Sequence, residues 1–590
     1  MDERMSDADV QPGVPVAEPQ HGFDDSRRLT GPNRYFADSA VTLTPLGRFS
    51  GDAAVHEAWA GRVRSLGAAL GWPDPEPRSV RRASAILLVF RAPPDVLFTA
   101  TDINEWAWER AAQDAGESQF DLAHDLGPDA TAAFMARAAA ERRPEIAALR
   151  AAAAAHRVSM IEDDVQISLG EGAGSRCWLR TAVPAVEAVP WGALYDIPTV
   201  LVTGSNGKTT TVRLLAAMAS AAGLIPGSCS TEGIVVGAET SLRGDYAGPD
   251  GARAVLRQPL VQVAILETAR GGILRRGLAV RRADVAIVTN ISPDHLGEYG
   301  VDGAEDLADT KLVVAHALHG GGTLVVNADD AILPIAIARL AYAARVRHAL
   351  FAADYDHSAL VAHRAQAGST CGVRDGELRL FHGGHEHRLG SIREMPLAVG
   401  GAARYNIANL SAAALGGAAL RFPQAAIRET LHRFGARPED NPGRLERWVY
   451  RGASVLIDYA HNPDGLASLL GVARALQPDR LCLLLGQAGN RDDAAIGDLA
   501  RTAARFAPDR IVIKELPLML RGRVLGEVPA LLERALLAAG VAAERIRFEP
   551  NELTAAMSLL DGAAPGDVIV LPIHTDSVRE PLRARLRSQQ

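Results

Sequence analysis

The residues best suited to bind an anion lie in the stretch LVTGSNGKTTTVRLL, residues 201–215. Gly204 and Gly207 allow backbone angles that other residues resist, so the amides of this turn can point inward at phosphate oxygens. We expect a helix to begin at Lys208, and its positive end would add to the attraction. The spacing Gly-x-x-Gly-Lys-Thr is shorter than that of the usual P-loop, where a glycine would replace Val202. The alternative is an ordinary strand-to-helix turn.

The turn offers a nucleotide several kinds of ligand. Lys208 is long enough to reach the terminal phosphates, and the hydroxyl group of Thr209 can coordinate Mg²⁺. The sequence therefore predicts ATP and Mg²⁺ as ligands. The residues that we expect to bind ATP in the turn are consecutive: Gly204, Ser205, Asn206, Gly207, Lys208, Thr209 and Thr210.

A sheet must hold this turn, and the surrounding sequence predicts one. Short apolar runs end in polar residues and alternate with helical segments, which is typical of strands buried on both faces: PTVLVTG, VQVAILET, ADVAIVTN and GTLVVNADD. A second set follows residue 431: ASVLIDYAH, LCLLLGQ, RIVIKE and DVIVLPI. We predict the α/β class, with a central P-loop-type parallel sheet covered by helices on both faces and a Rossmann-like C-terminal α/β domain.

The N-terminal region has a different character. Residues 83–93 indicate a buried strand, and the Ala-rich region 129–156 indicates two helices that part near Pro144. We therefore expect a mixed α+β domain. The predicted division is a disordered, acidic and Pro-containing tail at 1–27, an N-terminal domain at 28–195, a central ATP-binding domain at 196–430 and a C-terminal domain at 431–590.

Composition limits the function classes. The 590 residues carry 62 basic and 70 acidic side chains, and their scattered arginines do not support a nucleic-acid or membrane-surface role. The N-terminus has no signal-peptide pattern, and we find no apolar stretch of about 18 residues that could span a membrane. The four cysteines form no Cys-x-x-Cys pair and fit a reducing compartment. A cytoplasmic protein is the expectation.

Several motifs, taken in order, resemble the Mur ligase family. The short glycine turn is joined by LETARGGILRRGL, VTNISPDHLG and GEYGVDGAEDLADTK, and these look especially like the Mur-ligase half of cyanophycin synthetases. RRLTGPNRYF, residues 27–36, weakly resembles the N-terminal domain of those enzymes. The chain before the turn is too short to hold an ATP-grasp module as well. We therefore expect one ligase site.

The resemblance implies a metal site built around the turn. Thr209, Glu267 at a strand end, His295 and Lys311 would be metal ligands, and Lys208, Glu267, His295 and Lys311 would be catalytic. It further implies that CO₂ carbamylates Lys311, which we place on a helix over residues 304–318, and so turns a cation into an oxygen ligand. Asp294 would orient His295. A helix-capping acid, a structural histidine and a solvated lysine are the alternatives.

The resemblance also assigns residues farther along the chain. Asn406 and Asn409 would contact adenine or fix their helix, where simple helix capping is the alternative. Arg444 would reach the phosphates and Asp458 the ribose. The residues expected to face substrate are Arg270, His461, Asn462, Asp464, Arg491 and Asp492.

Two of these assignments concern the incoming amino acid. Arg491 and Asp492 would hold its carboxylate and amine, and a surface ion pair is an equal alternative. Leu516, Pro517 and Leu518 stand where the cyanophycin synthetase pattern would place acidic residues. Arginine is therefore in question as the amino acid, because a guanidinium group favours an acidic pocket.

The sequence thus predicts an ATP- and Mg²⁺-dependent carboxylate–amine ligase that forms an amide or isopeptide bond through an acyl phosphate. Its partners would be a small-molecule or peptide carboxylate, such as an aspartyl group, and an amino acid. A muropeptide or polyglutamate-type ligase is one alternative, and a non-catalytic nucleotide-binding regulatory subunit is another. The oligomeric state stays open, a homo-oligomer included.

Overall fold

The computed structural model describes residues 21–83, 85–118, 120, 122–126, 129–293 and 297–588. Two compact units are present, one made of residues 21–29 and 39–142 and the other of residues 30–38 and 143–588. Residues 1–20 of the expected tail lie outside the described part. From Phe23 the chain forms a strand, so the prediction of disorder is wrong for residues 23–27. The domain boundaries themselves stay a prediction.

The first unit is an antiparallel sheet with helices packed on it. The strand order is β1-β2-β4-β3. Val41, Leu88 and Phe90 of the sheet form one core with Trp59 and Trp108 of the helices. The elements are β1 (Phe23–Leu29), β2 (Ala40–Pro45), α1 (Ala53–Ala69), β3 (Arg78–Arg81), β4 (Ile86–Arg91), α2 (Leu97–Asp114) and α3 (Ala130–Glu141).

After residues 30–38, the second unit continues with the helix that we predicted to start near Pro144. This helix, α4 (Pro144–His156), is followed by a small antiparallel sheet in the order β5-β6-β7. Its strands are β5 (Met160–Glu162), β6 (Gln166–Leu169) and β7 (Arg176–Leu179). The break between α3 and α4 at Pro144 is confirmed.

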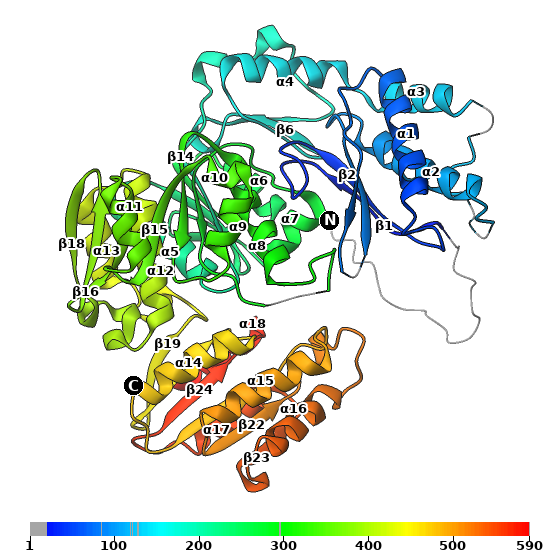
Figure 1. Ribbon diagram of the computed structural model, residues 1–590. Coiled ribbons are helices and arrows are strands. Elements are labelled where there is room, and N and C mark those ends of the chain that lie inside the picture. Colours follow the sequence, from blue (N-terminus) through cyan, green and yellow to red (C-terminus); the bar gives the residue numbers. More distant parts are fainter. Residues whose placement is uncertain are drawn as a thin grey trace. The chain divides into compact units, whose positions relative to one another are not determined.

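The central sheet of this unit has the order β11-β10-β9-β12-β8-β13-β14-β15-β16-β17-β18. Figure 1 labels β14, β15, β16 and β18 of this sheet. The strands from β9 to β16 in that order are parallel, so the predicted sheet type is confirmed for them. Hairpins make both edges antiparallel. The strands are β8 (Thr199–Thr203), β9 (Pro226–Ser230), β10 (Gly233–Val236), β11 (Glu239–Arg243), β12 (Val263–Glu267), β13 (Ala283–Val288), β14 (Leu318–Asn327), β15 (Arg347–Asp354), β16 (Ser369–Arg374), β17 (Glu377–His382) and β18 (His385–Ser391).

Helices cover both faces of this sheet, as predicted. Val200 and Val202 of β8 pack against one helix layer, while Leu201 between them packs against the other. This alternation places consecutive residues of a strand on opposite faces. The first layer contains α5 (Lys208–Ala221), α12 (Arg404–Ala419) and α13 (Gln424–Arg433). The second contains α6 (Pro249–Leu256), α7 (Arg270–Arg276), α8 (Ala304–Leu312), α9 (Leu333–Arg339) and α10 (Ala341–Ala344). The short helix α11 (Ser358–Ala365) joins β15 to β16.

One helix is shorter than we expected. The helix predicted over residues 304–318 ends at Leu312, a 3₁₀ turn follows at Val313–Ala317, and β14 begins at Leu318. Most of this apolar run is buried. The tighter turn lets the chain enter the sheet directly, which a continued α-helix would prevent.

The C-terminal sheet has the order β19-β20-β24-β21-β22-β23, with β19 antiparallel to an otherwise parallel set. Two cores on its opposite faces confirm the predicted α/β layering. Its strands are β19 (Glu446–Tyr450), β20 (Ala453–Asp458), β21 (Leu481–Leu485), β22 (Arg510–Lys514), β23 (Ile546–Glu549) and β24 (Val568–Pro572). Its helices are α14 (Pro463–Ala475), α15 (Asp493–Arg505), α16 (Glu527–Ala538), α17 (Glu552–Asp561) and α18 (Asp576–Arg587). None of the helices in the described residues is long and apolar enough to cross a membrane.

Candidate active site

The glycine turn joins β8 to α5, and α5 begins at Lys208 as predicted. Gly204 and Gly207 have φ angles of +146° and +85°. A Cβ atom at Gly204 would lie 1.8 Å from the Thr289 hydroxyl oxygen, and one at Gly207 would lie 2.2 Å from Asn409 Oδ1. Both positions therefore require glycine, for the backbone angle and for the space.

The loop after β13 holds the turn in place through hydrogen bonds that the sequence did not predict. The amides of Ser205 and Asn206 donate to Asn290 at 2.9 Å, and the Thr289 hydroxyl group donates to Asn206 O at 2.6 Å. In the described structure the next four N–H groups, those of residues 207–210, have no hydrogen-bond acceptor. Unpaired donors at a helix start attract anions, so these four donors are the ones available to a phosphate group.

A buried carboxylate lies beside the turn. Glu267 ends β12, is 1% exposed, and accepts a hydrogen bond from the Thr209 hydroxyl group at 2.8 Å. Its second oxygen, Oε1, is buried and has no hydrogen-bond partner in the described part of the chain. An unsatisfied buried oxygen costs free energy, which a cation would recover. Carboxylate and hydroxyl oxygens suit Mg²⁺, so the residues fit this metal.

Lys311 points at the same turn from α8. It is 4% exposed, and its ammonium group donates to Gly204 O at 2.8 Å. The alternative of a solvated helix lysine is therefore wrong. Carbamylation stays a prediction, as does the metal-binding role of His295, which lies with Asp294 outside the described residues.

The two asparagines of α12 are buried side by side. Asn409 Nδ2 donates to Asn406 Oδ1 at 3.1 Å, and Asn406 Nδ2 donates to Leu397 O at 3.2 Å. The helix N-cap is Ala403, so the capping alternative is wrong. These two hydrogen bonds support the expectation that the asparagines fix their helix, and the adenine contact stays a prediction.

The C-terminal domain contributes one direct contact to the turn. Asn462 caps α14 by accepting from Gly465 N at 2.8 Å, and its Nδ2 donates to Asn206 Oδ1 at 3.1 Å. His461 precedes it, with Nδ1 3.3 Å from Tyr459 O. Asp464 is exposed in the first turn of α14.

Arg444 and Asp458 lie near each other at the start of this domain. Asp458 accepts a hydrogen bond from Leu445 N at 2.7 Å, and burial raises the pKa of its carboxyl group while Arg444 opposes the rise. The Arg444 guanidinium group stacks 4.5 Å from the centre of the Tyr459 ring. Their roles toward phosphate and ribose stay predictions.

A charged cluster next to Arg444 was missed by the sequence analysis. Arg213 donates to Glu232 at 2.7 Å, and Arg579 lies 3.0 Å from the same carboxylate. Burial by itself raises the pKa of Glu232, but Arg213, Arg444 and Arg579 outweigh it and lower that pKa to about 2. Three guanidinium groups surround the Glu232 carboxylate, and Asp576 also pairs with Arg579 at 3.2 Å. The members are too far apart in the sequence to form a motif.

The remaining substrate candidates have structural partners. Arg270 Nη2 donates to Glu298 at 2.5 Å, next to the undescribed residues 294–296. Asp492 caps α15 through Ala495 N at 2.7 Å, and Arg491 O accepts from Arg523 at 2.7 Å. Their contacts with substrate stay predictions.

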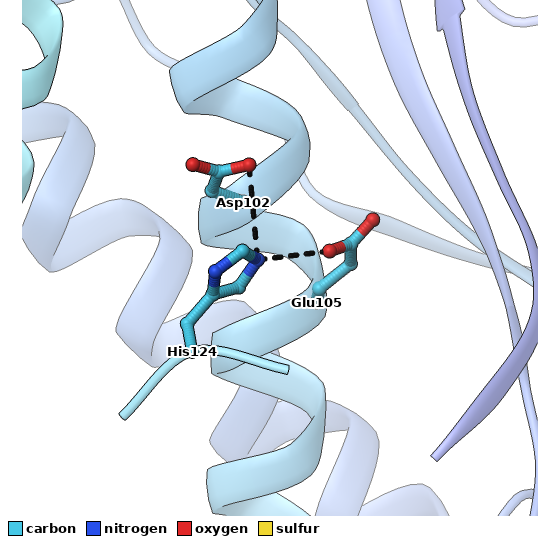
Figure 2. Close-up of side chains that lie close together, drawn as sticks. All are labelled: Asp102, Glu105 and His124. Carbon is cyan, nitrogen blue, oxygen red and sulfur yellow. Dashed lines mark hydrogen bonds and ion pairs between the residues drawn. The ribbon is translucent and has the colours of Figure 1, made fainter. Parts of the chain in front are cut away.

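A second group of metal-ligating side chains lies in the first unit. Figure 2 shows His124 between Asp102 and Glu105 of α2, with the His124 Nε2 atom 2.9 Å from Glu105. Arg137 of α3 donates to Asp102 at 2.6 Å and lies 3.4 Å from His124 Nδ1. Because Asp102 is paired with Arg137 and Glu105 with His124, we interpret this group as a charge network that joins α2 to α3.

Comparison with known families decides the identity of this unit. The Mur ligase middle domain matches residues 202–416, and the Mur ligase glutamate ligase domain matches residues 443–572. These matches together cover more than half of the chain. The chain belongs to the Mur ligase family. The predicted family is confirmed, and the glycine turn, Glu267 and Lys311 all fall within the middle-domain match.

Individual relatives of this Mur ligase chain cover different shares of its length. Cyanophycin synthetase from Synechocystis sp. is 34% identical over 409 residues, which are 69% of this chain and 46% of that protein. UDP-N-acetylmuramoyl-L-alanyl-D-glutamate–2,6-diaminopimelate ligase from Xanthomonas campestris pv. campestris is 32% identical over 325 residues, 54% of this chain and 61% of that protein. The structure of E. coli FolC in complex with DHPP and ADP gives a TM-score of 0.48 at 20% identity, covering 67% of this chain and 89% of that one. The chain thus spans less than half the length of the cyanophycin synthetase it matches.

Proposed function

We propose that this Mur ligase chain joins an amino acid to a carboxylate acceptor in an ATP- and Mg²⁺-dependent reaction. The observation that carries the proposal is the joint placement of four amides, at residues 207–210, and of the Thr209–Glu267 pair. Neither these amides nor Glu267 Oε1 has a hydrogen-bond partner among the described residues. The amides and Lys208 would hold the phosphates. Thr209 and Glu267 would hold Mg²⁺, which would supply the positive charge that phosphoryl transfer requires.

In the proposed reaction the acceptor carboxylate attacks the γ-phosphorus of ATP, and ADP leaves with the electron pair of the broken P–O bond. The acyl phosphate that results is a better electrophile than a carboxylate. The amine of the amino acid then attacks the acyl carbon, loses a proton, and releases inorganic phosphate as the amide bond forms. Binding both substrates next to the phosphate turn would provide the proximity that these steps need.

The acceptor belongs to the proposal. Relatives named cyanophycin synthetase and diaminopimelate ligase support a small-molecule or peptide carboxylate, an aspartyl group included. A panel of acceptors and amino acids, scored by ADP release and by mass spectrometry of the product, would identify the pair. ATP binding without ADP formation for every pair would instead favour a non-catalytic nucleotide-binding subunit.

The amino acid would meet loops at the carboxyl edge of the C-terminal sheet. The loop after β20 contacts the phosphate turn through Asn462, and Gln487 after β21 donates to His461 O at 3.0 Å. Gly489 N in turn donates to Met519 O, in the loop after β22, at 2.8 Å. These hydrogen bonds connect the phosphate turn, through the loops after β20 and β21, to the loop at residues 516–526.

This last loop supports an amino acid with a neutral side chain. The Glu515 carboxylate accepts from Leu516 N and Gly526 N, and Arg523 engages both Asp493 and Glu527. Leu518 is 84% exposed on the same loop. Since a bound guanidinium group needs a carboxylate partner, we expect kcat/KM to be higher for neutral amino acids than for arginine. A clear preference for arginine would contradict this part.

Lys208→Ala provides the direct test of the ligase proposal. We expect ADP release to fall by about a hundredfold or more, because removal of one electrostatic stabiliser of a transition state costs at least that much. Arg433→Ala is a matched control, since Arg433 is exposed on α13, in the same helix layer as α5, and pairs only with Glu429 among the salt bridges described. Near-normal turnover of Lys208→Ala would remove the assignment.

A further inference from the structure

Residues 30–38 belong to the unit that contains the glycine turn, while residues 21–29 and 39–142 form the other unit. Thr30 N donates to Arg276 O, and Leu278 N donates to Pro32 O, both at 2.8 Å. A Cβ atom at Gly31 would lie 2.0 Å from Leu278 O, so only glycine fits there. The segment is thus closely fitted to the connection that follows α7.

Asn33 fixes the shape of this segment. It is 1% exposed, and its Nδ2 donates to Gly31 O at 3.0 Å and to Asp38 O at 2.8 Å. Its Oδ1 accepts from Tyr35 N and Phe36 N, both at 3.0 Å. Two donors and two acceptor sites are the full capacity of an asparagine side chain, so the turn has little freedom. The next residue, Arg34, is therefore presented in one direction.

Arg34 reaches the elements that carry the candidate metal ligands. Its side chain is 2% exposed, and its guanidinium group donates to Asp306 Oδ1 at 2.8 Å and to Gly300 O at 3.3 Å. Asp306 also accepts from Asp302 N at 3.1 Å. Gly300 and Asp302 lie in the loop that follows the His295 region, while Asp306 lies in the first turn of α8. One buried guanidinium group thus joins this loop to the helix of Lys311.

We infer that Arg34 is a positioning residue of the ligase site. It holds residues 297–306 in place through Asp306 and Gly300, and it thereby sets the position of Lys311, whose ammonium group lies 2.8 Å from Gly204 O. The inference rests on the proposed role of Lys311 and Glu267 at Mg²⁺. Groups that orient metal ligands typically change metal affinity by about 10–100-fold when removed. Residues 30–38 therefore help to position the metal-binding residues of the middle domain.

The test compares Arg34→Ala, Arg34→Lys and Asp306→Asn with a matched control in the full chain. Arg257→Ala is that control, because the Arg257 side chain is also buried, at 7% exposed, pairs with Asp163, and contacts Ser168, Ile161 and Gln166 of the small sheet instead of α8. We expect Arg34→Ala to raise the half-saturating Mg²⁺ concentration for ADP release about 10–100-fold. Arg34→Lys should recover part of this loss, and guanidinium ion added to Arg34→Ala should lower the Mg²⁺ requirement. Arg257→Ala should stay within about twofold.

Hydrogen exchange of the nucleotide-free protein separates this inference from the proposed function. Arg34→Ala should speed exchange in residues 297–312, and Arg257→Ala should leave that segment unchanged. If the wild-type protein releases no ADP but this exchange pattern appears, the ligase assignment fails and the positioning contact stands. Unchanged exchange in Arg34→Ala, or an unchanged Mg²⁺ requirement in an active variant, would overturn the inference.

Discussion

Replacing Gly207 with alanine should disable the phosphate-binding turn through two separable effects. The first is backbone strain, because Gly207 has a φ angle of +85° at the start of α5. The second is a clash, because the three atoms nearest to the new Cβ all belong to Asn409, at 2.2, 3.0 and 3.2 Å. Both effects act on the segment that holds the four unpaired amides.

The size of each effect follows from the geometry. The left-handed backbone conformation costs an ordinary residue about 1–2 kcal/mol. To reach normal contact distance Asn409 must withdraw by about 1 Å, which breaks its 3.1 Å hydrogen bond to Asn406 and leaves buried amide groups unsatisfied, at about 1–3 kcal/mol. Gly207→Ala should therefore destabilise the turn by about 2–5 kcal/mol.

The chain offers a control for the strain alone. Gly223 follows the other end of α5, has a φ angle of +81°, and would place a Cβ atom in open space. Gly223→Ala should cost only about 1–2 kcal/mol and should leave nucleotide affinity unchanged. The double variant Gly207→Ala/Asn409→Ala removes the clash but keeps the strain. It should therefore be less impaired than the sum of the two single changes predicts.

Local stability and affinity should be measured in parallel, by hydrogen exchange of the α5 amides and by calorimetric titration with ATP and Mg²⁺. Gly207→Ala should speed the exchange of α5 and abolish measurable binding. If Gly207→Ala matched Gly223→Ala in both measurements, the geometry that we assign to the turn would be refuted.

The remaining predictions address charge and chemistry. Glu552→Gln should destabilise the C-terminal domain by about 3–5 kcal/mol in denaturant unfolding, since it removes the carboxylate that pairs with the fully buried ammonium group of Lys514. Glu580→Gln, at an exposed carboxylate, should have little effect. The pKa of Glu232 is about 2 in the folded protein and 4.5 ordinarily, so the free energy by which its charge stabilises the fold is complete above pH 4.5 and is lost as the pH falls toward 2. In Glu232→Gln, the free energy of unfolding should therefore lose roughly 3 kcal/mol less between pH 4.5 and pH 2 than in the wild type. An unchanged acid-unfolding profile would contradict this prediction. The sequence has only three lysines: Lys208, Lys311 and Lys514. If Lys311 is carbamylated, ¹³C NMR with labelled bicarbonate should give a carbamate signal that disappears in Lys311→Met and persists in Lys208→Met. A signal that persists in Lys311→Met would reject the carbamylation of Lys311.

The sequence predicts the parts of the site that local chemistry determines. A Val-rich strand, two glycines and Lys-Thr together allow few structures other than a strand–turn–helix, and the start of α5 at Lys208 is as expected. The position of Glu267 at a strand end could also be predicted, because the carboxyl ends of parallel strands share one edge of the sheet.

Other features depend on contacts between distant parts of the chain. Arg34 and Asp306 are 272 positions apart, and nothing in the local sequence of either residue specifies the other. The same holds for Glu232 and Arg579, whose pairing exists only once the domains are folded. The end of α8 was misjudged because an apolar run does not distinguish a continued helix from a short turn into a buried strand.

The most direct test of the central claim is a crystal structure with Mg²⁺ and a non-hydrolysable ATP analogue. We expect the terminal phosphates to accept hydrogen bonds from the amides of residues 207–210, and Mg²⁺ to contact the Thr209 hydroxyl group and the Glu267 oxygen that lacks a protein partner. Nucleotide bound elsewhere, with this turn free of phosphate at saturating concentration, would contradict the account.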